Sequence, residues 1–275
     1  NLGIEGIMTI GALVGWTTVY LGGDLSTGIL VAALVGASFG LLHALFSVYL
    51  GASQHVTGIG ITLFASSIGY YSFRILLPSS TTPPKIVAFQ TIEIPVLSDI
   101  PFLGIALFQH TTFTYFAFLM VPIVFWLMNK TPLGLAIKVA GENPMALEAQ
   151  GLDVLFIRTI ALMIGSALMA LGGAYLTMSA FDAFYFGMVN GRGWIAIALV
   201  IFASWQPFRA LLGAILFAGF DAFQVRAQQL AGAFIAYQFF LMLPYILSIV
   251  AMIFAAKSTH YPRALLIPFR RGERH

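Results

Sequence analysis

Residues 28–50 read GILVAALVGASFGLLHALFSVYL and contain no Asp, Glu, Lys or Arg. A helix needs roughly 20 apolar residues to cross the hydrocarbon core of a bilayer. Because this run has that length and no full charge, it predicts a helix that spans a membrane.

Seven further apolar runs flank this one, at 7–21, 58–77, 113–128, 155–178, 193–203, 208–223 and 234–256. The run at 193–203 is short, and the run at 208–223 carries Arg209 and Asp221, so we expect interrupted helices there. The pattern predicts an all-α fold, a polytopic transmembrane helix bundle with about eight spans and broken helices. We expect one transmembrane domain over 1–275, with halves at 1–129 and 159–256, a polar segment at 130–158 and a tail at 257–275.

The composition agrees with a membrane protein and excludes several classes of function. Of the 275 residues, 60% are hydrophobic and 8% are charged, whereas a soluble domain has roughly 25% charged residues. The chain has no Cys, which excludes disulfides, thiolate catalysis and iron–sulfur clusters. It also has no His-Glu-x-x-His and no paired intramembrane Asp, so an intramembrane enzyme is disfavoured. We predict no catalytic residues, no metal site and no nucleic-acid partner.

Basic residues predict the orientation in the bilayer, because Lys and Arg accumulate on the cytoplasmic side. We therefore expect the 130–158 segment and the C-terminus to be cytoplasmic and 78–112 to lie outside. The chain does not begin with Met, which leaves open a helix before residue 1. Aromatic residues near the predicted outer ends are expected to form an interfacial belt, namely Trp16, Tyr20, Tyr70, Tyr71, Phe181, Phe184, Tyr185 and Phe186.

The polar segment contains the pattern of a small capped helix. Asn143 is a good N-cap, Pro144 suits the first helical position, and Gly151 can end the helix with a positive φ. A helix of about two turns is marginal alone. It therefore needs a partner surface, either within this chain or on another subunit.

Small residues predict close contacts between helices, since they let two backbones approach. They are Gly11 and Gly15, Gly36 and Gly40, and the run Gly165, Ser166, Ala167, Gly172, Gly173 and Ala174. This signal is structural and carries no information about a transported solute.

The chain resembles the permease subunits of ATP-binding-cassette importers, in the branch for branched-chain amino acids, simple sugars and nucleosides. The resemblance covers nearly the whole chain and is greatest to the simple-sugar and nucleoside group. It rests on Asn1-Leu2-Gly3-Ile4-Glu5-Gly6, Thr131-Pro132-Leu133-Gly134, Gly141-Glu142-Asn143-Pro144 with Gly151, and Gly187 with Gly191-Arg192-Gly193-Trp194.

The resemblance implies that residues 144–150 form a cytoplasmic coupling helix, which sits in a groove of an ATP-binding subunit. The implied coupling residues are Glu142, Asn143, Pro144, Met145, Ala146, Leu147, Glu148, Ala149 and Gly151. ATP and Mg²⁺ are then bound by the partner subunit and no cofactor by this chain. The other implied partners are a second permease chain, like or unlike this one, and an extracytoplasmic solute-binding protein, in a cell inner membrane.

Two Gly-flanked charges at the ends of apolar runs indicate a translocation pathway. Ionisable groups at membrane depth normally face a cavity or a partner, and broken helices in two halves mark pathways. We predict that Asn1, Glu5, Asn190 and Arg192 line or brace it. The alternatives are an interfacial position for Glu5 and, for Arg192, an ion pair with Asp182 or Asp221.

The predicted function is therefore a membrane-spanning importer subunit that transports a small polar solute, a nucleoside or a simple sugar. A branched-chain amino acid importer permease is the first alternative. An ion-coupled secondary transporter also explains broken helices and buried charges, but leaves the capped cytoplasmic helix unexplained. These alternatives remain open at the level of sequence.

Overall fold

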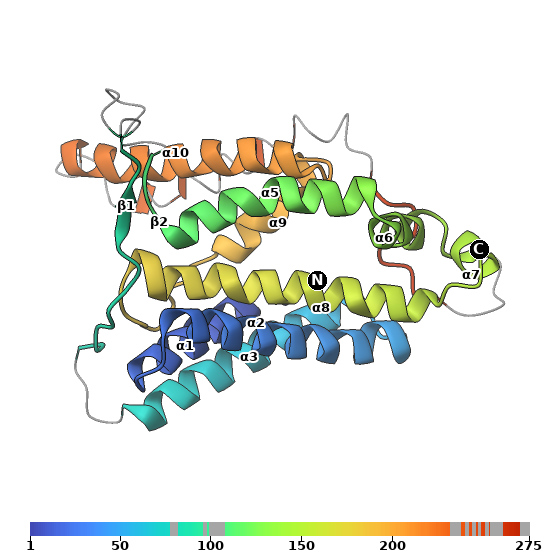
Figure 1. Cartoon of the computed structure of the whole chain (residues 1–275), viewed down its shortest axis with the longest axis horizontal. Coiled ribbons are helices and arrows are strands. Elements are labelled where there is room, and N and C mark those ends of the chain that lie inside the picture. Colours follow the sequence, from blue (N-terminus) through green and yellow to red (C-terminus); the bar gives the residue numbers. More distant parts are fainter. Residues whose placement is uncertain are drawn as a thin grey trace.

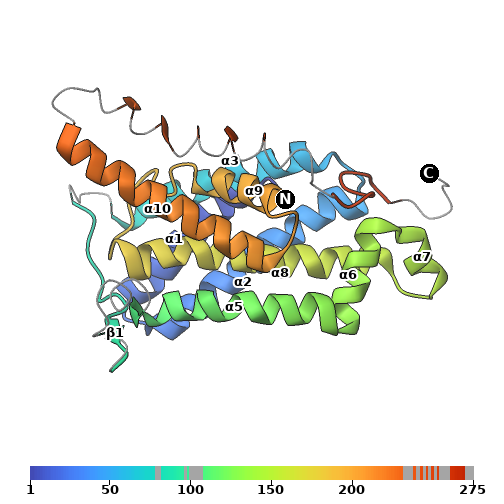
Figure 2. The same ribbon diagram turned by 90° about the horizontal axis from the view of Figure 1, so that it is seen from above.

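The computed structural model describes residues 1–77, 82–95, 98, 108–231 and 261–269, with 238–239, 242–243, 246, 249–250 and 253. Its long helices run roughly parallel in an elongated bundle (Figures 1 and 2). Their bounds are α1 Ile4–Tyr20, α2 Leu25–Ala44, α3 Gln54–Leu76, α5 Thr112–Lys130, α6 Pro132–Glu142, α7 Pro144–Ala149, α8 Val154–Tyr175, α9 Arg192–Phe202 and α10 Pro207–Ala231. The π-helical turns η1 Leu45–Tyr49 and η2 Leu176–Ala180 continue α2 and α8.

The helices have the length and the outer surface of membrane spans. In the described residues five are long and apolar enough to cross a bilayer, at Leu25–Tyr49, Gln54–Leu76, Thr112–Lys130, Val154–Ala180 and Pro207–Gln229. Ile4–Tyr20 and Arg192–Phe202 are shorter apolar helices. Large side chains such as Leu30, Leu63 and Trp126 are exposed on them, as lipid contact requires. The helical bundle is confirmed; the count of eight stays a prediction, since the run at 234–256 lies mostly outside the described residues.

Four helices form a tightly packed group in which α8 lies against α2 and α1, and α1 also packs on α3. Glycines allow this approach: a Cβ at Gly36 would press on Ser166 and Ala170, and one at Gly173 would overlap the Met8 carbonyl. The predicted small-residue contacts are therefore present at these sites. Gly165, by contrast, has open space beside it.

Two of the eight aromatic residues depart from the predicted belt, whereas five others are exposed, namely Tyr20, Tyr71, Phe181, Tyr185 and Phe186. Trp16 and Phe184 are fully buried, in a core cluster with Leu13, Phe73 and Met188. The Trp16 indole stacks on Tyr20 and donates a hydrogen bond from Nε1 to the Pro84 carbonyl at 3.3 Å. These rings belong to the protein core because the segments at 82–90 and 181–189 fold over them.

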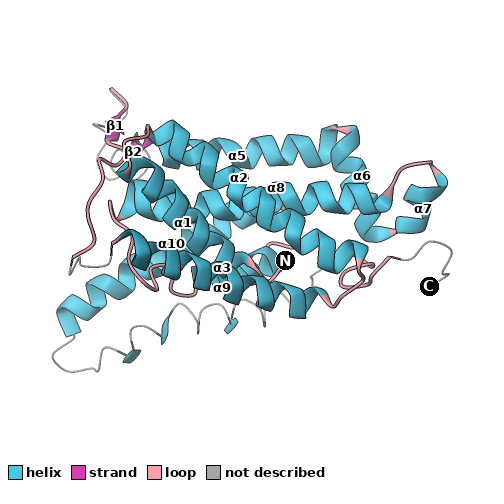
Figure 3. Ribbon diagram, turned by 90° about the horizontal axis from the view of Figure 1, so that it is seen from below, coloured by secondary structure: helices cyan, strands magenta, loops and turns pink. Residues whose placement is uncertain are grey.

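A small hairpin lies at the end of the bundle opposite α6 and α7 (Figure 1). Strands β1 Thr91–Glu93 and β2 Gln109–Thr111 pair antiparallel, with Thr91 opposite Thr111. Figure 3 shows the two strands beside the helical bundle. The two ends of the bundle thus differ: one has the hairpin, and the other has the short helices of the polar segment.

Candidate functional site

Glu5 joins the two halves of the chain at the start of α9. Its Oε1 accepts a hydrogen bond from the Gly191 amide at 2.7 Å, and its Oε2 accepts one from the Gly193 amide at 2.9 Å. The first amides of a helix lack intrahelical partners, and a carboxylate is favourable at this positive end of the helix dipole. Glu5, in the first turn of α1, therefore caps a helix nearly two hundred positions further along the chain.

Gly191 and Gly193 are required at this junction for different reasons. Gly191 has φ +77°, a left-handed conformation that glycine adopts without strain. A Cβ on Gly193 would lie 2.6 Å from Glu5 Oε2 and 3.0 Å from its Cα. The glycines thus make the turn and leave room for the carboxylate.

Arg192 turns back onto the loop before α9. Its Nη1 donates to the Met188 carbonyl at 3.1 Å and to the Val189 carbonyl at 3.4 Å, and its guanidinium lies 6.0 Å from the centre of the Phe181 ring. The partners of Arg192 are therefore backbone carbonyls and an aromatic face. In the described part of the chain it forms no ion pair with Asp182 or Asp221.

The four predicted pathway residues fall into two places. Glu5, Asn190 and Arg192 meet at the α1–α9 junction, where Asn190 is exposed with φ +47°. Asn1 instead donates from Nδ2 to Ser166 Oγ at 3.1 Å and lines a cavity further along the bundle. Their contact with a solute remains a prediction.

The 130–158 segment contains two capped helices. Asn143 Oδ1 accepts from the Ala146 amide at 3.1 Å, Pro144 begins α7, and Gly151 follows with φ +80°. These are the predicted cap, first position and end. The helix α6 before it was not predicted, and its cap is Thr131, whose Oγ1 accepts from the Gly134 amide at 3.1 Å.

Helix α7 has one inner and one outer face. Leu147 is buried in a cluster with Ala136, Ala140, Val154 and Ile157. On the outer side Met145, Ala146, Ala149 and Gln150 are exposed, with Glu142 and Asn143 just before them, while Pro144 and Glu148 are half-buried. In Figures 1 and 2 the helix projects beyond the ends of its neighbours. Leu147 therefore anchors α7 within this chain and is not available for docking.

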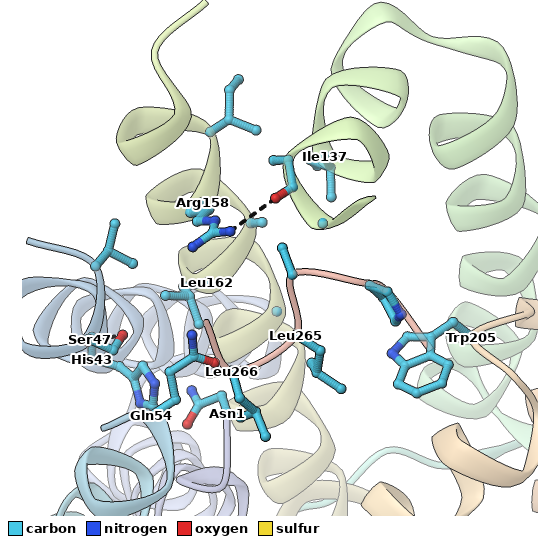
Figure 4. Close-up of a pocket in the computed structure, with 18 of the residues that line it drawn as sticks. Asn1, His43, Ser47, Gln54, Ile137, Arg158, Leu162, Trp205, Leu265 and Leu266 are labelled. Carbon is cyan, nitrogen blue, oxygen red and sulfur yellow. Dashed lines mark hydrogen bonds between the residues drawn. The ribbon is translucent and has the colours of Figure 1, made fainter. Parts of the chain in front are cut away.

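Arg158 of α8 holds α6 and residues 261–269 in place. Its Nη2 donates to the Ala140 carbonyl at 3.1 Å, the contact drawn in Figure 4. Its Nη1 donates to the Ile267 carbonyl at 3.0 Å, and the Ala264 amide donates to the Gly141 carbonyl at 2.8 Å. From the sequence, Arg158 was used only to predict the orientation in the bilayer. Its position in an apolar helix could also have indicated that its guanidinium is hydrogen-bonded within the protein.

Comparison with known proteins places the chain in a family. A family model described as branched-chain amino acid transport system / permease component matches residues 1–256. The "Putative glucose ABC transporter permease protein" of Haloferax volcanii is 34% identical over 84% of this chain and 70% of its own length. The guanosine ABC transporter permease protein of Bacillus subtilis is 33% identical over 100% of this chain and 88% of its own.

A third relative, the nucleoside ABC transporter permease protein of Lactococcus lactis, is 32% identical over 92% of this chain and 82% of its own. No solved structure matches the chain. Since the family model spans most of the sequence and these relatives align over most of their lengths, the chain belongs to the branched-chain amino acid transport system permease component family.

Proposed function

We propose that this chain is the permease subunit of an ATP-binding-cassette importer that carries a nucleoside or a simple sugar. The three relatives described above support this, since two are named for nucleosides and one for glucose. The proposal treats residues 1–275 as one permease domain without catalytic activity of its own. A second permease chain and a solute-binding protein complete the transporter.

The observation that carries the proposal is the projecting helix α7, anchored on one side and exposed on the other. We propose that its outer face docks on an ATP-binding subunit, which binds ATP and Mg²⁺. In this arrangement the 130–158 segment and the C-terminus are cytoplasmic, and the β1–β2 end faces the binding protein.

The anchors of α7 give the coupling a physical route. Leu147 packs on Val154 and Ile157 of α8, and Arg158 holds the α6 carbonyl of Ala140. A displacement of α7 by its partner is therefore transferred to α8, which packs on α1 and α2. The partner drives this change only if it binds α7 differently in its two states.

The test is co-purification of this chain with candidate ATP-binding subunits. Met145→Glu places a charge at the centre of the docking face, and we expect roughly tenfold or greater loss of the bound subunit. The control is Leu21→Glu, at a leucine that is 70% exposed and follows α1. Retention of the subunit by Met145→Glu at the wild-type level would contradict the docking proposal.

A further inference from the structure

A cavity of about 520 Å³ lies between α2, α8 and the coupling segment. Its walls come from both halves of the chain: the end of α2 with η1, the start of α3, α6, α8, the α9–α10 loop and residues 262–266. The volume is within the range of small-molecule sites, about 300–1,000 Å³. The cavity is therefore large enough for a solute and is next to the segment that the partner would move.

His43 is the unusual residue in its wall. The side chain is 1% exposed, and its Nδ1 has no hydrogen-bond partner in the described residues. Buried polar atoms in proteins nearly always have partners. The nearby Ser47 Oγ donates its hydrogen bond to the His43 backbone carbonyl at 2.8 Å and not to the ring nitrogen. An imidazole in this state is suited to a ligand that brings its own hydrogen-bonding group.

The cavity has a polar side and an aromatic side (Figure 4). His43, Gln54 and Asn1 lie on one side, and the indole of Trp205 lies on the other. Trp205 has φ +57°, a strained conformation for so large a residue. Such strain is compatible with a required position of the ring. Hydroxyl groups could bond the polar side, while a base or sugar ring packs on the indole.

The charges of the wall discriminate between solute classes. Arg158 is charged, and none of the described residues that line the cavity is acidic. The ammonium group of a zwitterionic amino acid would have no acidic partner among these residues, at a large cost in desolvation. Its carboxylate would have to compete for Arg158, whose guanidinium already donates to the Ala140 and Ile267 carbonyls. A neutral nucleoside or sugar has no such cost.

We propose that this cavity holds the neutral solute at the coupling end of the translocation pathway, with the His43 ring turning to bring Nδ1 to a solute hydroxyl or ring nitrogen and Trp205 covering a ring face. The inference rests on the proposed function and adds the site and its residues. Because α6 and α8 form part of the wall, movement of the coupling segment changes the cavity.

The experiment measures ATP-dependent uptake of radiolabelled guanosine, glucose and leucine by vesicles that contain the complete transporter. His43→Leu removes the polar atom, and we expect KM for guanosine or glucose to rise about tenfold. His43→Asn places an amide atom near the position of Nδ1, and we expect it to restore most of the affinity. His55→Leu, at an exposed histidine outside the cavity wall, is the matched control.

Assembly is checked by co-purification with the ATP-binding subunit. If His43→Leu does not assemble, Gln54→Leu, at a half-buried position of the same wall, is expected to raise KM in the same way. Equal KM values for wild type, His43→Leu and His43→Asn, with guanosine or glucose still imported, overturn the cavity site alone. Import of leucine in place of both, or no ATP-dependent uptake, overturns the proposed function and this inference with it.

Discussion

At the scale of single residues, Glu5 shows how a charge in an apolar chain can have a structural role. Both carboxylate oxygens accept backbone amides at the start of α9. Hydrogen bonds to a charged group are stronger than neutral ones. The carboxylate therefore fixes the position at which the chain enters α9. This is a structural role and not direct contact with a solute.

Glu5→Gln tests this role. The new amide group would put an NH₂ against the N–H of Gly191 or Gly193, so one backbone donor loses its acceptor. We expect a loss of about 1–3 kcal/mol in stability, measured as a lower Tm of the detergent-solubilised protein. The control is Glu93→Gln, on the exposed strand β1. A Glu5→Gln protein with unchanged Tm and impaired uptake would favour solute contact over capping.

At the scale of elements, α7 is a helix of six residues whose stability depends on its cap and its anchor. Asn143→Ala removes the acceptor for the Ala146 amide, which costs about 1 kcal/mol. We expect amide hydrogen exchange over 145–149 to accelerate roughly fivefold. Ser53→Ala is the matched control, because Ser53 precedes α3 without a side-chain cap bond. Equal exchange in the Asn143→Ala protein and wild type would show that the Leu147 anchor alone holds α7.

The elements were predictable where the signal is local. The apolar runs and the Asn143-Pro144 cap gave the spans and α7, since both depend on neighbouring residues. The same cap pattern, Thr131-Pro132, begins α6, and it could have been used to predict that helix. The burial of Leu147 was not predictable, because it depends on how α6 and α8 meet.

Contacts between residues far apart in the chain could not be predicted from the sequence either, because they too depend on how the helices meet. Glu5 was predicted to line or brace the pathway, but its partners are 186 and 188 positions away. His43 was one polar residue among many in the apolar runs, and only the packing of α2 against α8 shows that it lies in the wall of a cavity. Periodicity predicts which residues are apolar, whereas the fold decides which polar atoms meet.

At the scale of the whole molecule, the two halves are held together by α8, which packs on α1 and α2. Two adjacent glycines of α8, Gly172 and Gly173, allow the effect of this interface to be distinguished from the effect of helix propensity. A Cβ at Gly173 would overlap the Met8 carbonyl, whereas one at Gly172 would lie 3.9 Å from Met8 Cε, an ordinary contact. The two sites thus share a helix and a residue type but differ in their neighbours.

We expect Gly173→Ala to force α1 and α8 apart and to cost about 1–3 kcal/mol or more. Gly172→Ala is expected to be neutral or slightly stabilising, since Ala favours helix by about 1 kcal/mol over Gly. Thermal unfolding in detergent compares the two variants, and uptake is measured in parallel. Under the proposed coupling route from α7 through α8 to α1, Gly173→Ala should also reduce transport at temperatures where the protein remains folded. Equal Tm values for the two variants would mean that this contact does not hold the halves together.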